Sequence, residues 1–387
     1  METQKLNWGK ILLLGFGFFS ISITWSLYNA FVPIFLEKFI SSVFWIGIIM
    51  TIDNYFGLFI QPLVGTLSDR TNTKYGRRMP YLLVGMPIAA LFVFFVPFHF
   101  NFITLFVTIV VMNMSMSIFR SPTIALMPDI TPRALHSKAN GLINFMGGIG
   151  AVLAFGVGSI LYKMNIALPF ILAGVLILVS LAIMFWQIKE KRDVIHYTVE
   201  TKEKFSFKAL RTPNVLFLLL AIFFWFVSYQ GVETLFTLYG KNHIGIDESA
   251  AAMSLAFFSL AFVLFAIPSG LLGTKFGKKP MIVIGIVGLV MVFSSLIFIQ
   301  DMWTMRGVLL LGGLFWACIN INSYPVVIEM AEVKDIGQFT GFYYLFSSLA
   351  AIASPPLLGM LIDGFGYGVL FIYAVSAMVI ALICILA

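Results

Sequence analysis

The side chains that could move a proton or hold a polar solute are few, and three of them stand inside long apolar runs. Asp53, Arg120 and Glu233 each interrupt a stretch that is otherwise hydrophobic. A charge at the bilayer centre costs about 2.5–3.5 kcal/mol on insertion scales, so such residues usually face a cavity and mark a pathway. A carboxyl group there can gain and lose a proton. Asp53 is therefore the first candidate for proton coupling, Glu233 is the second, and Arg120 is a candidate counter-ion of Asp53.

Polar and aromatic side chains fall on single faces of several apolar runs. Asn113, Ser117 and Arg120 follow the spacing i, i+4, i+7, and Tyr229 and Glu233 stand one helical turn apart. Amides and carboxylates suit hydroxyl groups, and aromatic rings suit the apolar faces of a sugar. Polar residues also hydrogen-bond between spans without any ligand, and that alternative stays open for each residue. The predicted substrate-binding set is Trp25, Tyr28, Asn29, Asp53, Asn54, Asn113, Ser117, Arg120, Tyr229, Gln230, Glu233, Trp316 and Asn320.

A short basic loop follows the second apolar run and recurs in a weaker form later in the chain. Residues 68–80 read SDRTNTKYGRRMP, and residues 274–280 read TKFGKKP. Arginines form strong paired hydrogen bonds with carboxylates, and we predict Asp129 as the partner of the loop arginines. Loop cations also accumulate on the cytoplasmic side without any such role, which is the alternative. The predicted cytoplasmic gate consists of Gly65, Asp69, Arg70, Arg77, Arg78 and Asp129.

The composition places these side chains in a membrane. Hydrophobic residues make up 60% of the 387 residues and charged residues 11%, against roughly 45–50% and about 25% in soluble domains. A soluble fold could not cover so much apolar surface. The net charge of +7 then reflects loop cations, and we expect no nucleic-acid partner. The two cysteines lie in apolar runs and indicate neither a disulfide nor a metal site, so we expect no cofactor.

Cutting the chain at charged or Pro- and Gly-marked loops gives twelve candidate spans. Each is about as long as a membrane-crossing helix requires, and each is continuously apolar, whereas barrel strands alternate. The predicted spans are 9–36, 43–65, 81–98, 101–127, 139–163, 167–188, 213–239, 249–273, 280–299, 303–329, 338–362 and 367–386. Because most Lys and Arg then fall on one side, we predict that both termini are cytoplasmic. The expected location is a plasma membrane or bacterial inner membrane, crossed many times.

The basic loop and its surroundings occur twice because the half-molecule occurs twice. Gly76 has a counterpart in Gly277, and Pro122 precedes Asp129 by the same distance as Pro325 precedes Glu332. The predicted fold is all-α, with twelve transmembrane helices in two pseudo-symmetric six-helix bundles. The predicted domains are residues 1–188, a cytoplasmic linker over 189–212, and residues 213–387. Duplicated halves are typical of secondary transporters, whose substrate binds between the halves, and we expect a monomer.

Residues 65–78, GTLSDRTNTKYGRR, resemble the loop signature of the major facilitator superfamily. The longer stretch 56–85 resembles the sucrose/proton symporters of solute carrier family 45 and their glycoside-pentoside-hexuronide-like relatives. Three positions depart from those patterns. Asn113 stands where the symporters carry a proton-binding acid, and Ile124 stands where they carry an arginine. Gln61 replaces a cation-binding Asp of the melibiose-type relatives, so the coupling residues of these families do not transfer directly.

The resemblance implies a secondary active transporter working by alternating access. Its expected activity is proton-coupled symport of a disaccharide or related glycoside, with sodium left open as the coupling ion. The alternative is an uncoupled or antiport carrier of another small molecule, which Asn113 favours. A membrane-embedded transferase needs clustered carboxylates or a catalytic His in a span, and a channel needs repeated filter residues. The sequence has neither feature, so we expect no enzyme.

Overall fold

The computed structural model describes residues 8–131, 136–190, 210, 212–331 and 335–387. This part of the chain is almost wholly helical and contains 12 helices that are long and apolar enough to cross a membrane. It holds no β-strand apart from an isolated bridge between Thr73 and Gly76. The predicted all-α fold with twelve spans is therefore confirmed. Glu332 and most of the predicted linker 189–212 lie outside the described residues.

The helices match the predicted spans to within a few residues, and some spans consist of two helical pieces. The first six spans are α1 (Trp8–Glu37), α2 with α3 (Val43–Met50, Ile52–Arg70), α4 with the short helix η1 (Met79–Phe95, Val96–Phe98), α5 (Phe102–Ile130), α6 with α7 (His136–Phe155, Val157–Met164) and α8 (Leu168–Gln187). The last six are α10 with the turn η4 (Pro213–Tyr239, Gly240–Ile244), α11 (Glu248–Phe276), α12 (Lys278–Leu296), α13 (Met302–Glu329), α14 (Ile336–Phe365) and α15 (Val369–Leu386).

Polar side chains set several of these helix boundaries. The Asn101 side chain accepts a hydrogen bond from the backbone N–H of Thr104 at 2.9 Å, and the backbone N–H of Asn101 donates in turn to Thr104 Oγ1 at 3.1 Å, which forms a capping box at the start of α5. Asp301 caps α13 through Thr304 in a similar way. These hydrogen bonds lower the pKa of the Asp301 carboxyl, because they favour its charged form.

The second span extends further than the sequence predicted. Residues 43–65 were expected to cross the membrane, but α3 continues to Arg70. The last turn stays helical because Ser68 donates to the carbonyl of Gly65 and also accepts from Arg78, so its hydroxyl is buried and bonded. The polar sequence SDR therefore belongs to the helix end and not to the loop.

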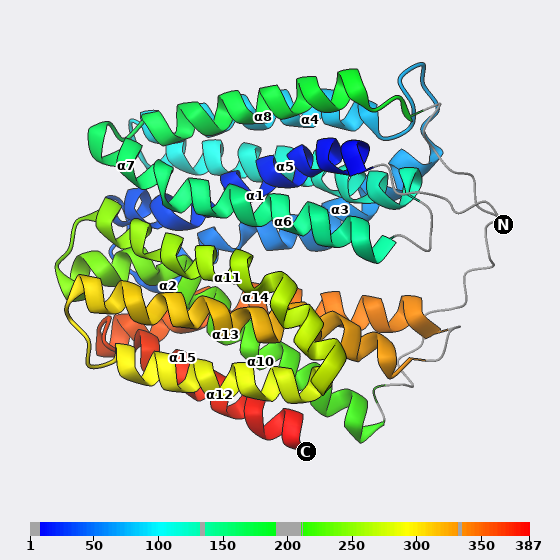
Figure 1. The fold of residues 1–387 in the computed structure, drawn as a ribbon. Helices are drawn as coiled ribbons and strands as arrows, with labels where there is room; N and C mark the ends of the chain where they lie inside the picture. Colours follow the sequence, from blue (N-terminus) through cyan, green and yellow to red (C-terminus); the bar gives the residue numbers. More distant parts are fainter. Residues whose placement is uncertain (1–7, 132–135, 191–209, 211, 332–334) are drawn as a thin grey trace. The chain divides into compact units, whose positions relative to one another are not determined.

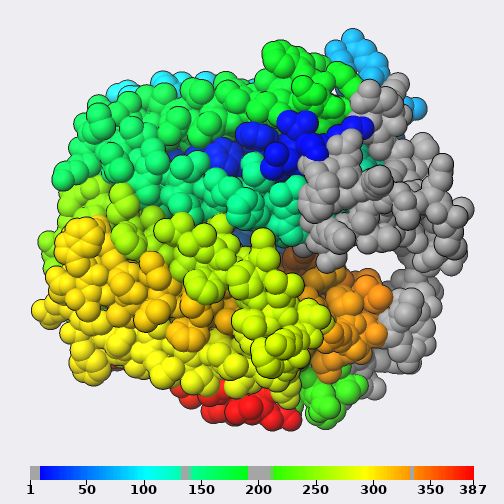
Figure 2. Space-filling model, viewed as in Figure 1, coloured from blue at the N-terminus to red at the C-terminus, as the bar shows by residue number. Residues whose placement is uncertain are grey.

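The chain divides into two compact units (Figure 1). Unit 1 contains residues 1–28 and 52–199, and unit 2 contains residues 29–51 and 200–387. In unit 1, α4 packs against α5 and α8, and α3 packs against α5. In unit 2, α13 packs against α11 and α12, and α10 packs against α14 and α15. The yellow-green, gold and yellow atoms of α11, α13 and α12 accordingly form a continuous surface in Figure 2.

One segment from the first half of the sequence belongs to unit 2. Residues 29–51, which include α2 and the end of α1, pack within unit 2, mainly through contact of α2 with α14. Lipid gives no hydrophobic driving force between helices, so small residues that allow close backbone approach decide such contacts. The same rule operates between α11 and α13, where a Cβ atom on Gly313 would lie 2.0 Å from the carbonyl oxygen of Phe258.

Candidate functional site

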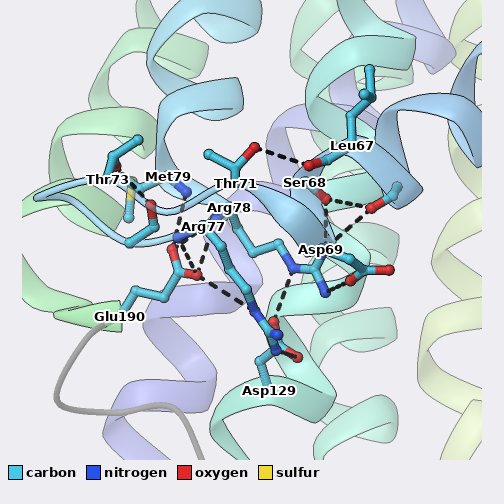
Figure 3. A network of polar contacts seen from close by, with 12 residues as sticks. Leu67, Ser68, Asp69, Thr71, Thr73, Arg77, Arg78, Met79, Asp129 and Glu190 are labelled. Carbon is cyan, nitrogen blue, oxygen red and sulfur yellow. Dashed lines mark hydrogen bonds and ion pairs between the residues drawn. The ribbon is translucent and has the colours of Figure 1, made fainter.

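The loop arginines form an ion-pair network with Asp129 at the end of α5 (Figure 3). Arg77 Nη2 lies 2.6 Å from Asp129 Oδ1, and Arg78 Nε lies 2.9 Å from Asp129 Oδ2. Arg78 Nη2 also lies 2.5 Å from Asp69 Oδ1. One carboxylate thus receives two arginines, and one arginine binds two carboxylates. We call Asp69, Arg77, Arg78, Asp129 and Glu190 the arginine cluster.

Arg78 is the centre of the arginine cluster. Its side chain is only 5% exposed, and its Nη1 donates to Ser68 Oγ at 2.5 Å and to the carbonyl of Gly65 at 3.4 Å. Burial by itself lowers the pKa of the Arg78 guanidinium, but the hydrogen bonds and charges of Asp129 and Asp69 outweigh it, so the pKa is raised above its ordinary value. Arg78 therefore keeps its positive charge, and the network depends on its carboxylates being ionised.

Glu190 is a member of the cluster that the sequence did not indicate. Its carboxylate is buried and accepts hydrogen bonds from the backbone N–H groups of Arg77 at 2.8 Å, Arg78 at 2.9 Å and Met79 at 3.1 Å. These N–H groups open α4, where a negative charge is favourable. Glu190 thereby fixes the loop backbone that presents both arginines to Asp129. In the sequence it stands in the run KEKR, where it looks like one more solvated charge.

A glycine makes room for the Glu190 carboxylate. Gly76 has φ +111°, and a Cβ atom there would lie 2.4 Å from Glu190 Oε2. The Gly-Arg-Arg motif thus needs glycine at position 76 for two reasons. Other residues rarely adopt this positive φ, and a side chain would collide with the Glu190 carboxylate.

Gly76→Ala should destabilise the fold by more than the backbone strain alone. Strain at a positive φ costs on the order of 1–3 kcal/mol, and the methyl group also displaces the carboxylate that caps α4. The matched control is Gly245→Ala, because Gly245 has φ +75° and no atom within 4 Å of a built Cβ. Thermal unfolding of both variants in detergent, followed by tryptophan fluorescence, measures the difference. Equal losses of stability would show that Glu190 contributes nothing.

Two further residues of the predicted gate, Gly65 and Arg70, differ in whether they contact the arginine cluster. Gly65 supplies the carbonyl oxygen noted above, and a Cβ atom there would lie 2.9 Å from Ser121 Oγ, so the residue also allows α3 to approach α5 closely. Arg70 is exposed at the end of α3 and makes no ion pair with the residues that the structure describes. The structure therefore does not bring Arg70 into the arginine cluster.

Five of the predicted polar residues gather inside unit 1. Asn113 Nδ2 on α5 donates to the Tyr28 hydroxyl on α1 at 3.3 Å, and the Tyr28 ring meets Trp25 edge to face with centroids 5.8 Å apart. Asp53 on α3 accepts from Asn54 Nδ2 at 2.9 Å. Asp53 lies close enough to Tyr28 for its charge to act on the Tyr28 hydroxyl. The Asn113–Tyr28–Trp25 contacts and the Asp53–Asn54 contact therefore belong to one group.

Arg120 on α5 belongs to the same polar group. It lies close enough to Asp53 for its positive charge to act on the carboxylate. Asn29 is the exception: it lies on the part of α1 that packs in unit 2, and no hydrogen bond links it to the described residues of the group. The group therefore contains the acid, its counter-charge and two aromatic rings.

Several polar atoms near this group have no hydrogen-bond partner among the described residues. They are Trp25 Nε1, Gln61 Nε2, Asn113 Oδ1 and Ser117 Oγ. Asn113 and Ser117 are completely buried. A buried polar group without a partner costs about 1–3 kcal/mol, and native structures contain few of them. Donors and acceptors of this kind on α1, α3 and α5 could hydrogen-bond a polar solute.

An aromatic group lies inside unit 2. The rings of Tyr229 on α10 and Trp316 on α13 are stacked, with centroids 4.2 Å apart and planes 5° apart. Phe226 meets Trp316 edge to face at 5.7 Å. The Tyr229 hydroxyl hydrogen-bonds Glu233 one helical turn away. Gln230 and Asn320 are half-buried on the same helices and make no hydrogen bond to this group within the described chain.

Tyr343 on α14 extends the aromatic group and is absent from the predicted set. Its hydroxyl lies 3.0 Å from Ser323 Oγ, and its ring contacts Phe226 at 6.3 Å and Tyr324 at 5.4 Å. The sequence signal was the pair Tyr343–Tyr344, which identifies aromatic residues but not their neighbours. Among the described residues, no three His, Cys, Asp or Glu side chains are grouped as a metal site would require.

Comparisons with known proteins agree with this architecture. The tetracycline resistance protein class H of Pasteurella multocida is 24% identical over 65% of this chain and 64% of its own length, so the match spans less than two thirds of that relative. The quinolone resistance protein NorA of Staphylococcus aureus strain MRSA252 is 22% identical over 92% of this chain and 90% of its own length. The structure of a bacterial homologue of the human lysosomal transporter Spinster superposes with a TM-score of 0.75 at 14% identity, covering 97% of this chain and 94% of that one.

The family itself follows from a match over nearly the whole chain. The model of the Major Facilitator Superfamily matches residues 14–257 and again residues 241–387. Together with twelve apolar helices and the solved transporter of the same fold, this shows that the chain is a multi-pass membrane transporter of the Major Facilitator Superfamily.

Proposed function

We propose that this chain is a proton-coupled secondary transporter of a small organic molecule that has hydrogen-bonding groups and a flat apolar face. The observation that carries the proposal is the set of buried polar atoms on α1, α3 and α5 of unit 1 that have no hydrogen-bond partner among the described residues. Unsatisfied donors and acceptors are costly in a membrane, and a bound solute would satisfy them in one state of the cycle.

Asp53 is the group that we assign to coupling. A carboxyl that alternates between proton-bound and free forms needs a neighbour whose charge supports the free form, and Arg120 supplies it. The Asn54 amide donates to the same carboxylate at 2.9 Å. Proton binding removes the negative charge and so weakens the interaction of Asp53 with Arg120, which gives a physical link between proton binding and the positions of α3 and α5.

The aromatic group in unit 2 supports a flat substrate face. The stacked Tyr229 and Trp316 rings offer an apolar surface, and Glu233 places a carboxyl one turn from it. Flat aromatic solutes with polar edges match this combination, and the names of two relatives refer to resistance against tetracycline and quinolones. We therefore propose a solute of this class, moved in exchange for protons.

A disaccharide is the second candidate. It is favoured by the mixture of amide, hydroxyl and indole groups without partners on α1, α3 and α5, because sugars need many hydrogen bonds and an aromatic surface. The sucrose-symporter resemblance of residues 56–85 supports the same candidate. The two candidates differ in the expected direction of coupling, which is antiport for the aromatic solute and symport for the sugar.

Transport by purified protein in liposomes tests both candidates. Radiolabelled tetracycline, a quinolone, sucrose and melibiose are offered under an imposed pH gradient of either direction, with a sodium gradient as a separate arm. We expect accumulation of the aromatic solutes in the compartment that is more acidic, which is the direction of proton exchange. Accumulation of a disaccharide in the more alkaline compartment would establish the second candidate instead. Transport driven only by sodium would contradict the assignment of protons.

A further inference from the structure

The N-terminus of α2 is capped by a carboxylate from a helix more than three hundred residues away in the chain. Asp363, near the end of α14, accepts from the backbone N–H of Val43 at 2.7 Å and of Phe44 at 3.1 Å, and from Ser42 Oγ at 2.6 Å. Helix N-termini carry free N–H groups and partial positive charge, so a carboxylate there is favourable. Ser42 itself makes no side-chain cap, which leaves this role to Asp363.

The backbones of α2 and α14 touch directly beside this cap. A Cβ atom on Gly47 would lie 2.5 Å from the carbonyl oxygen of Pro355, and one on Gly359 would lie 2.5 Å from the carbonyl oxygen of Val43. Two glycines, one on each helix, therefore allow the contact. Close approach through small residues is the main way in which helices associate in lipid.

A second carboxylate joins the end of α1 to η4 and to the turn between α14 and α15. Glu37 accepts from Lys241 Nζ at 3.0 Å, from Asn242 Nδ2 at 2.6 Å and from the Tyr367 hydroxyl at 3.4 Å. Lys241 is also paired with Glu248 at 3.0 Å. Burial and the charge of Glu37 raise the pKa of the Tyr367 hydroxyl well above its ordinary value, so it keeps the proton that it donates.

Both carboxylate sites lie at the end of the helices opposite the arginine cluster. Ser42 precedes α2 and Arg70 ends α3, so the span Val43–Arg70 has the Asp363 cap at its beginning and the arginine cluster at its end. The contacts join α1 to η4 and α2 to α14, so they link helices of the first half of the sequence to elements of the second. In alternating access, one repeat rocks against the other around a fixed site. Contacts between helices of different repeats must then break once in each cycle.

We propose that Asp363 and Glu37 form a second gate, at the end opposite the arginine cluster, and that each carboxylate stabilises the closed form of that end. The gate is defined by Glu37, Lys241, Asn242, Tyr367, Asp363 and the first turn of α2. It rests on the transport cycle proposed above but not on the identity of the substrate. Removing either charge favours opening at this end, because hydrogen bonds to a charged group stabilise by about 1.5–3 kcal/mol.

Thiol labelling of α2 tests the gate without any substrate. Val43→Cys, in a background where Cys318 and Cys384 are replaced by Ser, places a buried reporter against α14. In the purified protein in liposomes, a maleimide should label this cysteine slowly. Asp363→Asn keeps the size of the side chain but removes the charge, and Glu37→Gln does the same for the other carboxylate. We expect each to raise the labelling rate roughly tenfold, the factor that corresponds to about 1.4 kcal/mol.

The matched control is Asp301→Asn, since Asp301 also caps a helix, but its carboxylate bonds within the described residues only to Trp303 and Thr304 of its own helix. Its labelling rate should equal that of the unmodified background. An unchanged rate in Asp363→Asn and Glu37→Gln would overturn the proposal, and so would an equal rise in the control. A failed substrate screen leaves this result unaffected, so the gate and the proposed substrate stand or fall separately.

Discussion

Replacing Asp53 by Asn is expected to abolish accumulation driven by a pH gradient. One pH unit corresponds to about 1.4 kcal/mol, which suffices for roughly tenfold accumulation of a solute coupled to one proton. Asn keeps the shape of the side chain and its hydrogen bond with Asn54, but it cannot take up a proton. The variant should therefore bring the solute to equal concentrations on both sides and no further. Liposomes with a fixed pH gradient, followed over time with radiolabelled solute, measure this endpoint.

Exchange of labelled for unlabelled solute provides the internal control. Exchange needs binding and alternating access but no net proton movement, so Asp53→Asn should retain it. Loss of exchange together with accumulation would place Asp53 in folding or binding and not in coupling. Asp301→Asn, a change of the same kind at the exposed cap of α13, should leave both activities intact.

Glu233 is the second candidate for proton coupling. The variant Glu233→Gln shows which of the two acids couples transport to protons and which binds the solute. Glu233 hydrogen-bonds the Tyr229 hydroxyl beside the stacked Trp316 ring, so we expect Glu233→Gln to weaken solute binding. Its half-saturating solute concentration should rise while full accumulation remains possible at saturating solute. Accumulation that survives in Asp53→Asn but disappears in Glu233→Gln would reverse the two assignments.

The fold could be predicted from the sequence because the bilayer allows few solutions. Backbone polar groups in lipid must be satisfied within the segment, so a long apolar run is a helix or does not cross. The predicted and observed spans therefore agree closely. The largest differences lie where polar side chains hold a helix end, as Ser68 does for α3. Hydropathy cannot detect such an end, because the residues that stabilise it are hydrophilic.

The candidate sites were predictable only where their members share one helix or one motif. The spacing of Tyr229 and Glu233 placed them on one face, and the Gly-Arg-Arg motif pointed to Asp129. Stacking of Tyr229 on Trp316 depends on how α10 and α13 pack, which no local pattern encodes. Glu190 and Asp363 act through backbone N–H groups. Such partners leave no trace in the sequence, because every residue except proline offers the same donor.

Arg78→Lys is expected to disrupt the arginine cluster although it keeps the charge. The guanidinium of Arg78 contacts Asp129 through Nε, Asp69 through Nη2 and Ser68 through Nη1. A lysine ammonium is a single point charge and cannot reproduce this planar fork. Removing one partner from a buried ion pair typically costs 3–5 kcal/mol, and we expect Arg78→Lys to lose about half of that. Thermal unfolding in detergent should show a clearly lowered midpoint.

Arg77→Lys is the matched comparison for this effect. The Arg77 side chain is 34% exposed and reaches Asp129 through Nη2 at 2.6 Å, a contact that an ammonium can replace, while its Nε lies 4.0 Å from Glu190 Oε1. Exposed ion pairs contribute about 0–1 kcal/mol, so its midpoint should hardly change. If the unfolding midpoint falls more in Arg78→Lys than in Arg77→Lys, the planar geometry of the guanidinium, and not its charge alone, stabilises the cluster. Equal effects would mean that the cluster needs only positive charge near Asp129, as the positive-inside rule alone would supply.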